Sequence, residues 1–215
     1  MKKFAIIVAG GAGTRMKSDV PKQFLLHDGE PIIVKTIGKF LSFDPSITIV
    51  VVLPEKHLPH WQELKQRFPF ISAVKSAIGG ATRTESVLSG LNSIEEREGL
   101  VAIHDAVRPF VTSEVIGMSY ASAAKWGSGV AAVGLKDSIR EITGDSASIA
   151  RDRSNFVMVQ TPQTFNLSDI RAAFEKVGNT SYTDDASVYE AAGNKVFLIE
   201  GSYANIKITT PEDLK

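Results

Sequence analysis

Short apolar runs rich in β-branched residues alternate along this chain with stretches of helical periodicity. Buried strands are expected in the runs at residues 4–9, 47–53, 101–103, 130–133 and 196–199. Between these runs, apolar residues recur every three or four positions, as they do on one face of a helix. Strands that alternate with helices predict parallel crossovers. The pattern therefore indicates an α/β domain with a mostly parallel sheet, and its 215 residues suit one domain spanning 1–215.

The helical stretches lie at residues 31–41, 61–68, 87–94, 113–126, 167–177 and after 183. Thr112 or Ser113 could cap the fourth of these helices, because hydroxyl side chains accept hydrogen bonds from free N–H groups at a helix start. Thr183 could cap the last one. Asp184 and Asp185 would then lie near the positive end of that helix, where acidic side chains are favourable.

The segment around residues 136–153 departs from this alternation. Residues 136–142 alternate polar and apolar side chains, residues 144–146 suit a turn, and residues 149–151 resume the alternation. This pattern is typical of a polar hairpin, which would project from the sheet as a β-arm. An isolated hairpin is only marginally stable in water. We therefore expect the arm to pack on something, and a second subunit is a reasonable partner.

Composition excludes several functional classes. Lys plus Arg equals Asp plus Glu at 24 each, which argues against a general nucleic-acid binder. The chain has no cysteine, so disulfides, thiolate catalysis and cysteine-ligated zinc are excluded. The apolar stretch near the N-terminus is short and runs into glycines, unlike a secretory signal, and no apolar segment is long enough for a bilayer. The expected location is the cytoplasm, with no nucleic-acid or membrane partner.

The first predicted strand breaks into a glycine-rich loop, residues 10–16. Glycines let the backbone turn sharply and approach a ligand closely, and N–H groups in such a loop can cradle anionic oxygens. Arg15 and Lys22 add two positive charges, a combination that suits a nucleoside triphosphate. The loop is not a P-loop, because no Gly-Lys-Ser/Thr follows. It is a poor dinucleotide fingerprint, because Met16 stands where the third glycine should be.

Further motifs extend along the chain. They are Pro-Lys-Gln at 21–23, Gly-Gly-Ala-Thr-Arg at 79–83, His-Asp-Ala-Val-Arg-Pro at 104–109, Gln-Thr-Pro-Gln at 160–163, Thr-Asp-Asp-Ala at 183–186 and Asn-Ile-Lys-Ile-Thr at 205–209. With the glycine loop, and in this order, the chain resembles the 2-C-methyl-D-erythritol 4-phosphate cytidylyltransferase family over essentially its whole length. The resemblance implies a Rossmann-like, GT-A-like nucleotidyltransferase domain with a β-arm used in dimerisation.

The resemblance also implies a reaction. The cytidylyl group of CTP would pass to 2-C-methyl-D-erythritol 4-phosphate, with release of pyrophosphate, in non-mevalonate isoprenoid biosynthesis. Two polyanions must meet in this reaction, and charge builds on the α-phosphate oxygens, so preorganised cations are required. By resemblance, Arg15 and Lys22 stabilise the transition state and Lys207, at an expected strand end, positions the substrate phosphate. Arg153 would reach the active site of the neighbouring subunit.

The family resemblance assigns binding roles as well. CTP would be bound by Ala9, Gly10, Gly11, Gly13, Gly80, Ala81 and Ser86, and the polyol phosphate by Asp105, Arg108, Ser138, Thr161 and Thr183. Mg²⁺ or another divalent cation is expected on the CTP phosphates, with Asp105 as a candidate ligand. A salt bridge with Asp105 is the alternative role for Arg108. His104 is expected to orient its neighbours, because an ionised phosphate nucleophile needs no general base, and Arg83 is expected behind the site or on the surface.

Other functions remain open at this point. Ribitol 5-phosphate cytidylyltransferases share most of these motifs, and Val107 favours them, since alanine is commoner there in the methylerythritol enzymes. Residues 183–187 and the pair Asp152-Arg153 favour the methylerythritol family. A noncatalytic nucleotide-binding protein and a dinucleotide oxidoreductase are alternatives from other classes. The cations at the four positions predicted to be catalytic argue against the noncatalytic alternative.

Overall fold

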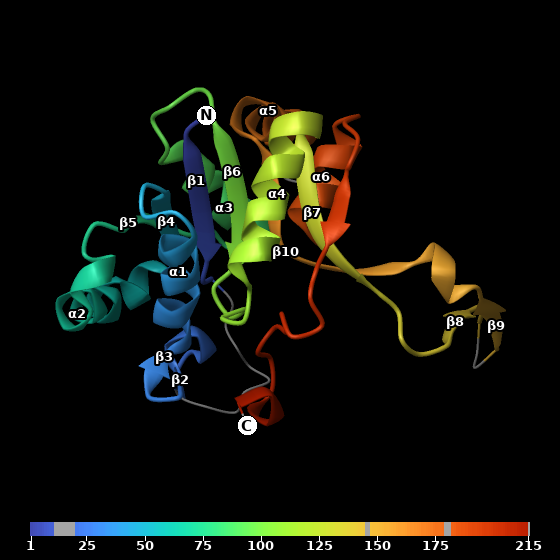
Figure 1. Cartoon of the computed structure of the whole chain (residues 1–215), viewed down its shortest axis with the longest axis horizontal. Coiled ribbons are helices and arrows are strands. Elements are labelled where there is room, and N and C mark those ends of the chain that lie inside the picture. The colour runs from blue at the N-terminus through green and yellow to red at the C-terminus, as the bar shows by residue number, and fades with distance from the viewer. Residues whose placement is uncertain (11–19, 145–146, 179–181, 215) are drawn as a thin grey trace.

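A seven-stranded sheet forms the centre of the computed structural model, which describes residues 1–10, 20–144, 147–178 and 182–214. In the order β11-β7-β10-β6-β1-β4-β5, the strands span Leu198–Glu200, Ser128–Gly134, Val157–Asn166, Leu100–Asp105, Lys3–Val8, Thr48–Leu53 and Lys75–Ile78. Neighbouring strands are parallel, except that β10 runs antiparallel to both β6 and β7. The predicted α/β architecture with a mostly parallel sheet is confirmed (Figure 1).

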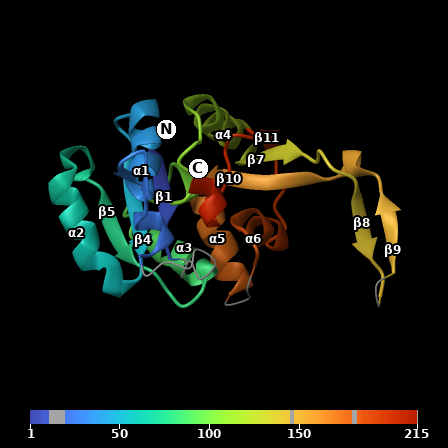
Figure 2. The same cartoon turned by 90° about the horizontal axis from the view of Figure 1, so that it is seen from below.

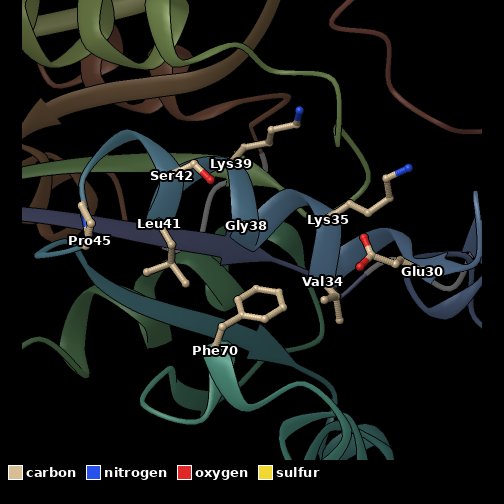
Figure 3. Close-up of a pocket in the computed structure, with 9 residues that line it drawn as sticks. All are labelled: Glu30, Val34, Lys35, Gly38, Lys39, Leu41, Ser42, Pro45 and Phe70. Carbon is tan, nitrogen blue, oxygen red and sulfur yellow. The ribbon is translucent and has the colours of Figure 1, made fainter.

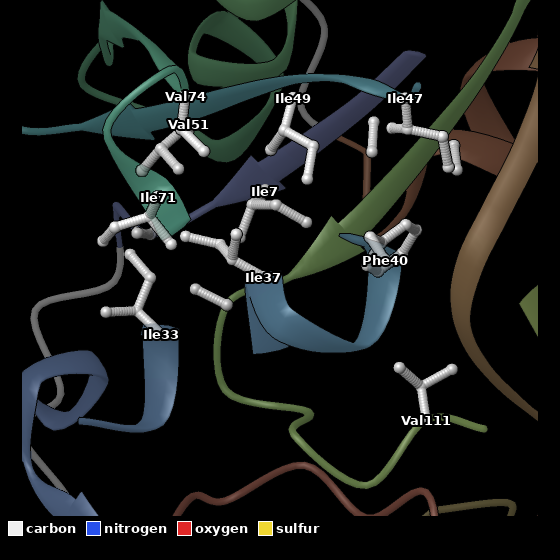
Figure 4. Close-up of a cluster of buried hydrophobic side chains, with 14 of the residues drawn as sticks. Ile7, Ile33, Ile37, Phe40, Ile47, Ile49, Val51, Ile71, Val74 and Val111 are labelled. Atoms are coloured by element: carbon white, nitrogen blue, oxygen red, sulfur yellow. The ribbon is translucent and has the colours of Figure 1, made fainter. Parts of the chain in front are cut away.

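Helices cover both faces of the sheet, which explains why its central strands are apolar on both sides. One face carries α1 (Ile32–Phe43), α2 (Leu58–Arg67) and α4 (Ser113–Trp126), and the other carries α3 (Arg83–Asn92), α5 (Leu167–Val177) and α6 (Asp185–Ala191), as Figure 2 shows. Ile7 of β1 packs with Ile33, Ile37 and Phe40 of α1 in the first core (Figure 4). Ile6 points the other way, into the second core. Because successive side chains of a strand point to opposite faces, β1 contributes to a hydrophobic layer on each side of the sheet.

The helices α3, α4, α5 and α6 start after short polar side chains that cap them. The Thr112 hydroxyl accepts a hydrogen bond from Val115 N at 3.3 Å, which confirms one of the two predicted caps of α4. The prediction for Thr183 is wrong. Asp184 is the cap of α6, since its carboxylate accepts from Ser187 N at 3.0 Å, and the helix begins one residue later than predicted. A carboxylate at this position also interacts favourably with the helix dipole.

The predicted hairpin is present. Strands β8 (Ile139–Ile142) and β9 (Ser148–Arg151) pair antiparallel in a sheet of their own, which projects far from the main sheet (Figure 1). A short 3₁₀ turn, η5 (Arg153–Asn155), leads from the arm into β10. The first residues of β10 lie outside the core, and Phe156, Val157, Met158 and Val159 are 42–45% exposed. The arm therefore joins the domain through a strand segment with exposed apolar side chains.

Two strands of the main sheet differ from expectation. β5 is short and mostly polar, so its pattern carries no strand signal. β10 contains Pro162, which argues against a central strand, but a shift of register between Val159 and Gln163 takes the proline out of the regular pairing. The segment around Lys207, expected to be a strand, is irregular. None of the helices in the part of the chain that the structure describes could cross a membrane, given their length and polarity.

The remaining elements are small. Strands β2 (Leu26–His27) and β3 (Glu30–Pro31) form a two-stranded ribbon before α1, and 3₁₀ turns are η2 (Lys22–Phe24), η3 (Glu55–His57), η4 (Pro69–Ile71) and η6 (Pro211–Leu214). The turn η2 matters for the site, because Gln23 is buried and donates from its amide to the Ala9 carbonyl at 2.9 Å. This bond fixes Lys22 beside the end of β1.

Candidate active site

A cavity of about 370 Å³ lies where the parallel strands β1 and β6 end. It is lined by Val8, Ala9 and Gly10 after β1, by Gly80–Arg83 and Ser86 around the start of α3, by Asp105–Val107 after β6, and by Lys22, Gln23 and Lys207. The carboxyl ends of parallel strands are where open α/β sheets bind their ligands. The topology therefore brings together residues that are up to two hundred positions apart in sequence.

A second, more polar cavity of about 140 Å³ adjoins the first. Its lining includes Arg108, Thr161, Gln163, Thr183 and Asp184. Three residues, Arg83, Asp105 and Lys207, line both cavities and so form their boundary. The predicted nucleotide residues that the structure describes (Ala9, Gly10, Gly80, Ala81 and Ser86) thus line the first cavity. The predicted polyol-phosphate residues, except Ser138, line the second cavity or its boundary. Two neighbouring ligands can therefore meet beside Asp105.

Asp105 is the electrostatic centre of this boundary. Its Oδ2 lies 2.9 Å from Lys207 Nζ and 3.4 Å from Arg108 Nε. Burial alone would raise the pKa of this carboxyl, but Lys207, Arg83 and Arg108 together lower it far below its ordinary value. Asp105 is therefore ionised at neutral pH. It holds the Lys207 ammonium in the cavity and keeps the surrounding cations from repelling one another.

Arg108 is in the salt bridge that the sequence raised as an alternative. Its Nη1 also donates to the Asn205 carbonyl at 2.7 Å, and it lines the smaller cavity. Asn205 is fully buried and donates from its amide to the Thr161 carbonyl at 2.8 Å. The Thr161 hydroxyl in turn accepts from Asp105 N at 3.1 Å. Arg108 thus belongs to a hydrogen-bonded framework and faces the cavity at the same time.

His104 has the orienting role expected of it. The side chain is fully buried, and its Nε2 donates to the Arg108 carbonyl at 3.2 Å, which fixes the turn after β6. Burial lowers the pKa of His104 to about 4, so the ring is neutral at physiological pH. Its Nδ1 finds no hydrogen-bond partner among the described residues. This histidine shapes the site and is remote from proton transfer.

The predicted nucleotide loop is held by its own helix. Thr82 and Glu85 form a capping box at the start of α3, and the Glu85 carboxylate accepts from Ala81 N at 2.7 Å and Thr82 N at 3.3 Å. A Cβ at Gly80 would lie 2.3 Å from the Glu85 Cβ, so this position requires glycine. The Thr-x-x-Glu spacing is visible in the sequence and could have predicted this cap. The loop therefore presents a fixed backbone to the cavity.

The predicted catalytic residues are only partly brought together. Lys22 and Lys207 line the same cavity, and Lys22 Nζ lies 3.5 Å from the Ile208 carbonyl. Arg15, Gly11 and Gly13 lie outside the described residues. Arg153 is exposed at the base of the arm, where it donates to the Lys136 carbonyl, and Ser138 is exposed nearby. Neither Arg153 nor Ser138 lines the cavities of its own chain.

Arg83 and Asp185 are the main residues to which the sequence assigned no direct role at the site. Arg83 forms two parallel hydrogen bonds with the fully buried Asp185, at 2.7 and 2.6 Å. Burial alone would lower the pKa of Arg83, but the carboxylate of Asp185 raises it above its ordinary value. Gln163 was also missed, although it belongs to a motif that the sequence singled out. Its Oε1 accepts from Asp185 N at 3.0 Å and Ala186 N at 2.8 Å.

A divalent cation would find few protein ligands here. The described residues contain no group of three or more His, Cys, Asp or Glu side chains that could hold a metal ion. Asp105 is the one carboxylate among the residues that line the larger cavity. Mg²⁺ keeps several waters and often takes only one or two carboxylates beside substrate phosphates. The donor set therefore fits a cation carried mainly by a bound triphosphate.

A cavity of greater volume than these two lies elsewhere. It has a volume of about 620 Å³, runs along α1, and is lined by Val34, Gly38, Leu41 and Phe70 with Glu30, Lys35 and Lys39 at its rim (Figure 3). No residue predicted for the site lines it. The converging charged groups and the fixed glycine backbone are at the two adjoining cavities around Asp105, so the chemistry belongs there.

A protein-family model described as 2-C-methyl-D-erythritol 4-phosphate cytidylyltransferase matches residues 4–215. The chain belongs to this family. A relative of that name from Phocaeicola vulgatus is 40% identical over 215 residues, which are 100% of this chain and 97% of the relative. One from Bacteroides thetaiotaomicron is 42% identical over the same shares. Both matches extend over the whole of this chain.

Solved structures agree with the family assignment. The 4-diphosphocytidyl-2C-methyl-D-erythritol synthase from Anaerococcus prevotii superposes with a TM-score of 0.85 at 27% identity, covering 99% of this chain and 94% of that one. The 2-C-methyl-D-erythritol 4-phosphate cytidylyltransferase from Francisella tularensis gives a TM-score of 0.80 at 31% identity, covering 100% and 97%. The predicted nucleotidyltransferase fold is confirmed by these neighbours.

Proposed function

We infer that this chain transfers the cytidylyl group of CTP to 2-C-methyl-D-erythritol 4-phosphate. The products are 4-diphosphocytidyl-2-C-methyl-D-erythritol and pyrophosphate, and the reaction belongs to non-mevalonate isoprenoid biosynthesis. One observation carries this inference beyond family membership. Lys22, Asp105 and Lys207 line one cavity together with Gly10 and the Gly80–Arg83 segment, and the polar cavity beside it is lined by Arg108, Thr161 and Thr183.

The chemistry is an in-line displacement at phosphorus. An oxygen of the polyol phosphate attacks the α-phosphorus of CTP, a new P–O bond forms, and the bond to the pyrophosphate oxygen breaks. The attacking phosphate is already ionised near neutral pH, so no general base is needed. The buried neutral His104 agrees with this, because it is engaged with the Arg108 carbonyl. The protein's task is to bring two anions together and to stabilise the charge that develops.

Three cationic side chains would each contribute to bringing the anions together and stabilising the developing charge. Lys207, fixed by Asp105 at 2.9 Å, stands at the boundary of the two cavities and would position the substrate phosphate. Arg108, held by Asp105 and the Asn205 carbonyl, would offset the repulsion between the two anions. Lys22, on the nucleotide side, would stabilise the charge on the α-phosphate oxygens in the transition state. The same role for Arg15 stays a prediction.

A bound Mg²⁺ or similar divalent cation would be held mainly by triphosphate oxygens and water, with Asp105 as the carboxylate that could join them. When bound, it neutralises phosphate charge and aids departure of pyrophosphate. The cations of the chain then act on the oxygens that the metal leaves uncovered. Cytidylyl transfer measured after removal of divalent cations, and again after Mg²⁺ is restored, tests this requirement.

We propose further that the active form is a homodimer built through the β-arm. The exposed apolar side chains of residues 156–159 offer a surface that a partner would cover. Arg153 and Ser138 lie exposed at the base of the arm and are thus available to the cavity of a neighbouring subunit. This arrangement would complete each site from two chains. The cytoplasmic location expected from the sequence also stays a prediction.

Pyrophosphate release tests the proposed function directly. The purified protein is incubated with CTP, Mg²⁺ and either 2-C-methyl-D-erythritol 4-phosphate or ribitol 5-phosphate, and product is identified by mass. Rapid release with the first acceptor and little with the second is expected. Preference for ribitol 5-phosphate would overturn the assignment of substrate, and no release with either would overturn the assignment of activity.

A further inference from the structure

Arg83 connects the nucleotide loop to the polyol side of the site. It is the first residue of α3, directly after the loop that includes Gly80 and Ala81. Its guanidinium crosses to Asp185, the first residue of α6, which follows Thr183 and Asp184. A bidentate pair of this kind fixes both distance and orientation. The two helix starts therefore cannot shift independently while the pair is intact.

Burial makes this pair hard to break. Asp185 is fully buried, whereas the Arg83 side chain is 27% exposed at the boundary of the two cavities. Separating the pair would leave an unpaired carboxylate in the interior, which is strongly unfavourable. Any rearrangement of the nucleotide loop through α3 is thus passed to the segment that carries Thr183.

The connection continues beyond Asp185. Gln163, which is 1% exposed, accepts from Asp185 N and donates to Asp184 Oδ2 at 2.9 Å. Gln163 lies two residues after Thr161, whose hydroxyl accepts from Asp105 N. The path from the nucleotide loop thus returns to the backbone of Asp105, whose side chain lines both cavities. The steps are hydrogen bonds between buried or half-buried groups, except the step from Gln163 to Thr161, which follows the backbone of β10.

We propose that the Arg83–Asp185 pair couples the two substrates, so that binding of the nucleotide increases the affinity for the polyol phosphate. This inference rests on the proposed function. Arg83 acts here as a positioning residue, because it orders the loop and the Thr183 segment. Coupling is reciprocal, so the polyol phosphate must increase the affinity for the nucleotide by the same factor. For the wild type we expect a factor of about ten, within the usual range of coupling between sites.

Calorimetric titration tests the proposal. The probes are 2-C-methyl-D-erythritol 4-phosphate and the non-reacting α,β-methylene analogue of CTP with Mg²⁺, each titrated alone and in the presence of the other. In Arg83→Gln and in Asp185→Asn the coupling factor should fall close to one. The double variant should fall no further, because either change alone removes the pair. Arg83→Lys keeps the charge without the fork and should also lose most of the coupling.

Asp185→Asn is the decisive variant, because Arg83→Gln leaves a buried carboxylate unpaired and can fail to fold. Asparagine has nearly the same shape, and the backbone N–H of residue 185 can still donate to Gln163. Arg97→Gln is the matched control, because Arg97 is exposed on the loop after α3 and should keep the wild-type factor.

The proposal is overturned if the folded Asp185→Asn protein retains the wild-type factor, or if the wild type binds both ligands without coupling. Failure of the wild type to bind 2-C-methyl-D-erythritol 4-phosphate, with or without the analogue, would instead overturn the proposed function. The two failures are therefore distinguishable in one set of titrations.

Discussion

Replacement of His104 should change how the stability of this protein depends on pH. The pKa of His104 is lowered from 6.5 to about 4 because the ring is buried. The unfolded chain therefore binds a proton at this residue as the pH falls through about 6.5, while the folded protein does not until about 4. Stability is present in full above 6.5 and is lost progressively across this window.

The size of the loss follows from the shift. A difference of one pKa unit corresponds to about 1.4 kcal/mol, so His104 should remove up to about 3 kcal/mol between pH 6.5 and 4. Asp105 adds little in this window, because an unfolded aspartate titrates near 3.8. The lowered pKa of His57 acts in the same direction, but it is common to wild type and variant and cancels in their comparison.

His104→Gln keeps an amide that can donate to the Arg108 carbonyl and removes the titration. Urea unfolding of both proteins, measured at intervals from pH 7.5 to 4.5, should show a much flatter pH dependence for the variant. Parallel curves for wild type and His104→Gln would refute the reasoning. The pH profile of turnover should be unchanged, since this residue is no general base.

The remaining predictions concern the site. Lys22→Ala should lower turnover by about 100- to 1,000-fold, as loss of one preorganised donor to a developing oxyanion does, with little change in melting temperature; a loss below tenfold would contradict its role. Mixing Arg153→Ala subunits with Lys22→Ala subunits should restore activity in verified mixed dimers, because one site of each dimer then has both side chains; no recovery would argue against shared sites. Gly80→Ala should raise the KM for CTP, since the new methyl group meets Glu85; an unchanged KM for CTP would argue against a fixed backbone at this loop.

The sequence predicted much of this fold because its strands and helices are strongly periodic. Ile6 and Ile7 lie in an apolar run that is typical of a strand buried on both faces. Helix α4 has a threonine cap at its start, and it is followed by Gly127, whose φ of 88° suits glycine. β5 and β10 escaped prediction for physical reasons. The first is a polar edge strand, and the second has a proline that its irregular register accommodates only in the folded sheet.

The site was predicted mainly from motifs, which identify residues without their mutual contacts. Asp105, Arg108 and Lys207 do meet, but Arg108 and Asp105 are held by hydrogen bonds to Asn205 and Thr161, which are far from them in sequence. Asp184 was placed correctly near a helix start, although Thr183 was preferred as the cap. The pairing of Arg83 with Asp185 spans 102 positions and has no local signal at all. Long-range partnerships of this kind depend on the topology of the sheet.

The two ends of strand β10 lie in different surroundings. Its ten residues extend about 33 Å, from the exposed segment beside the arm to the buried core next to β6. The hairpin at the outer end forms a sheet separate from the one that carries the cavity. Changes in the length of that hairpin therefore leave the pairing of β10 with β6 in register. The outer part of the hairpin can diverge in length during evolution, whereas the base of the arm is tied, in the proposed dimer, to the chemistry of a neighbouring site through Arg153 and Ser138.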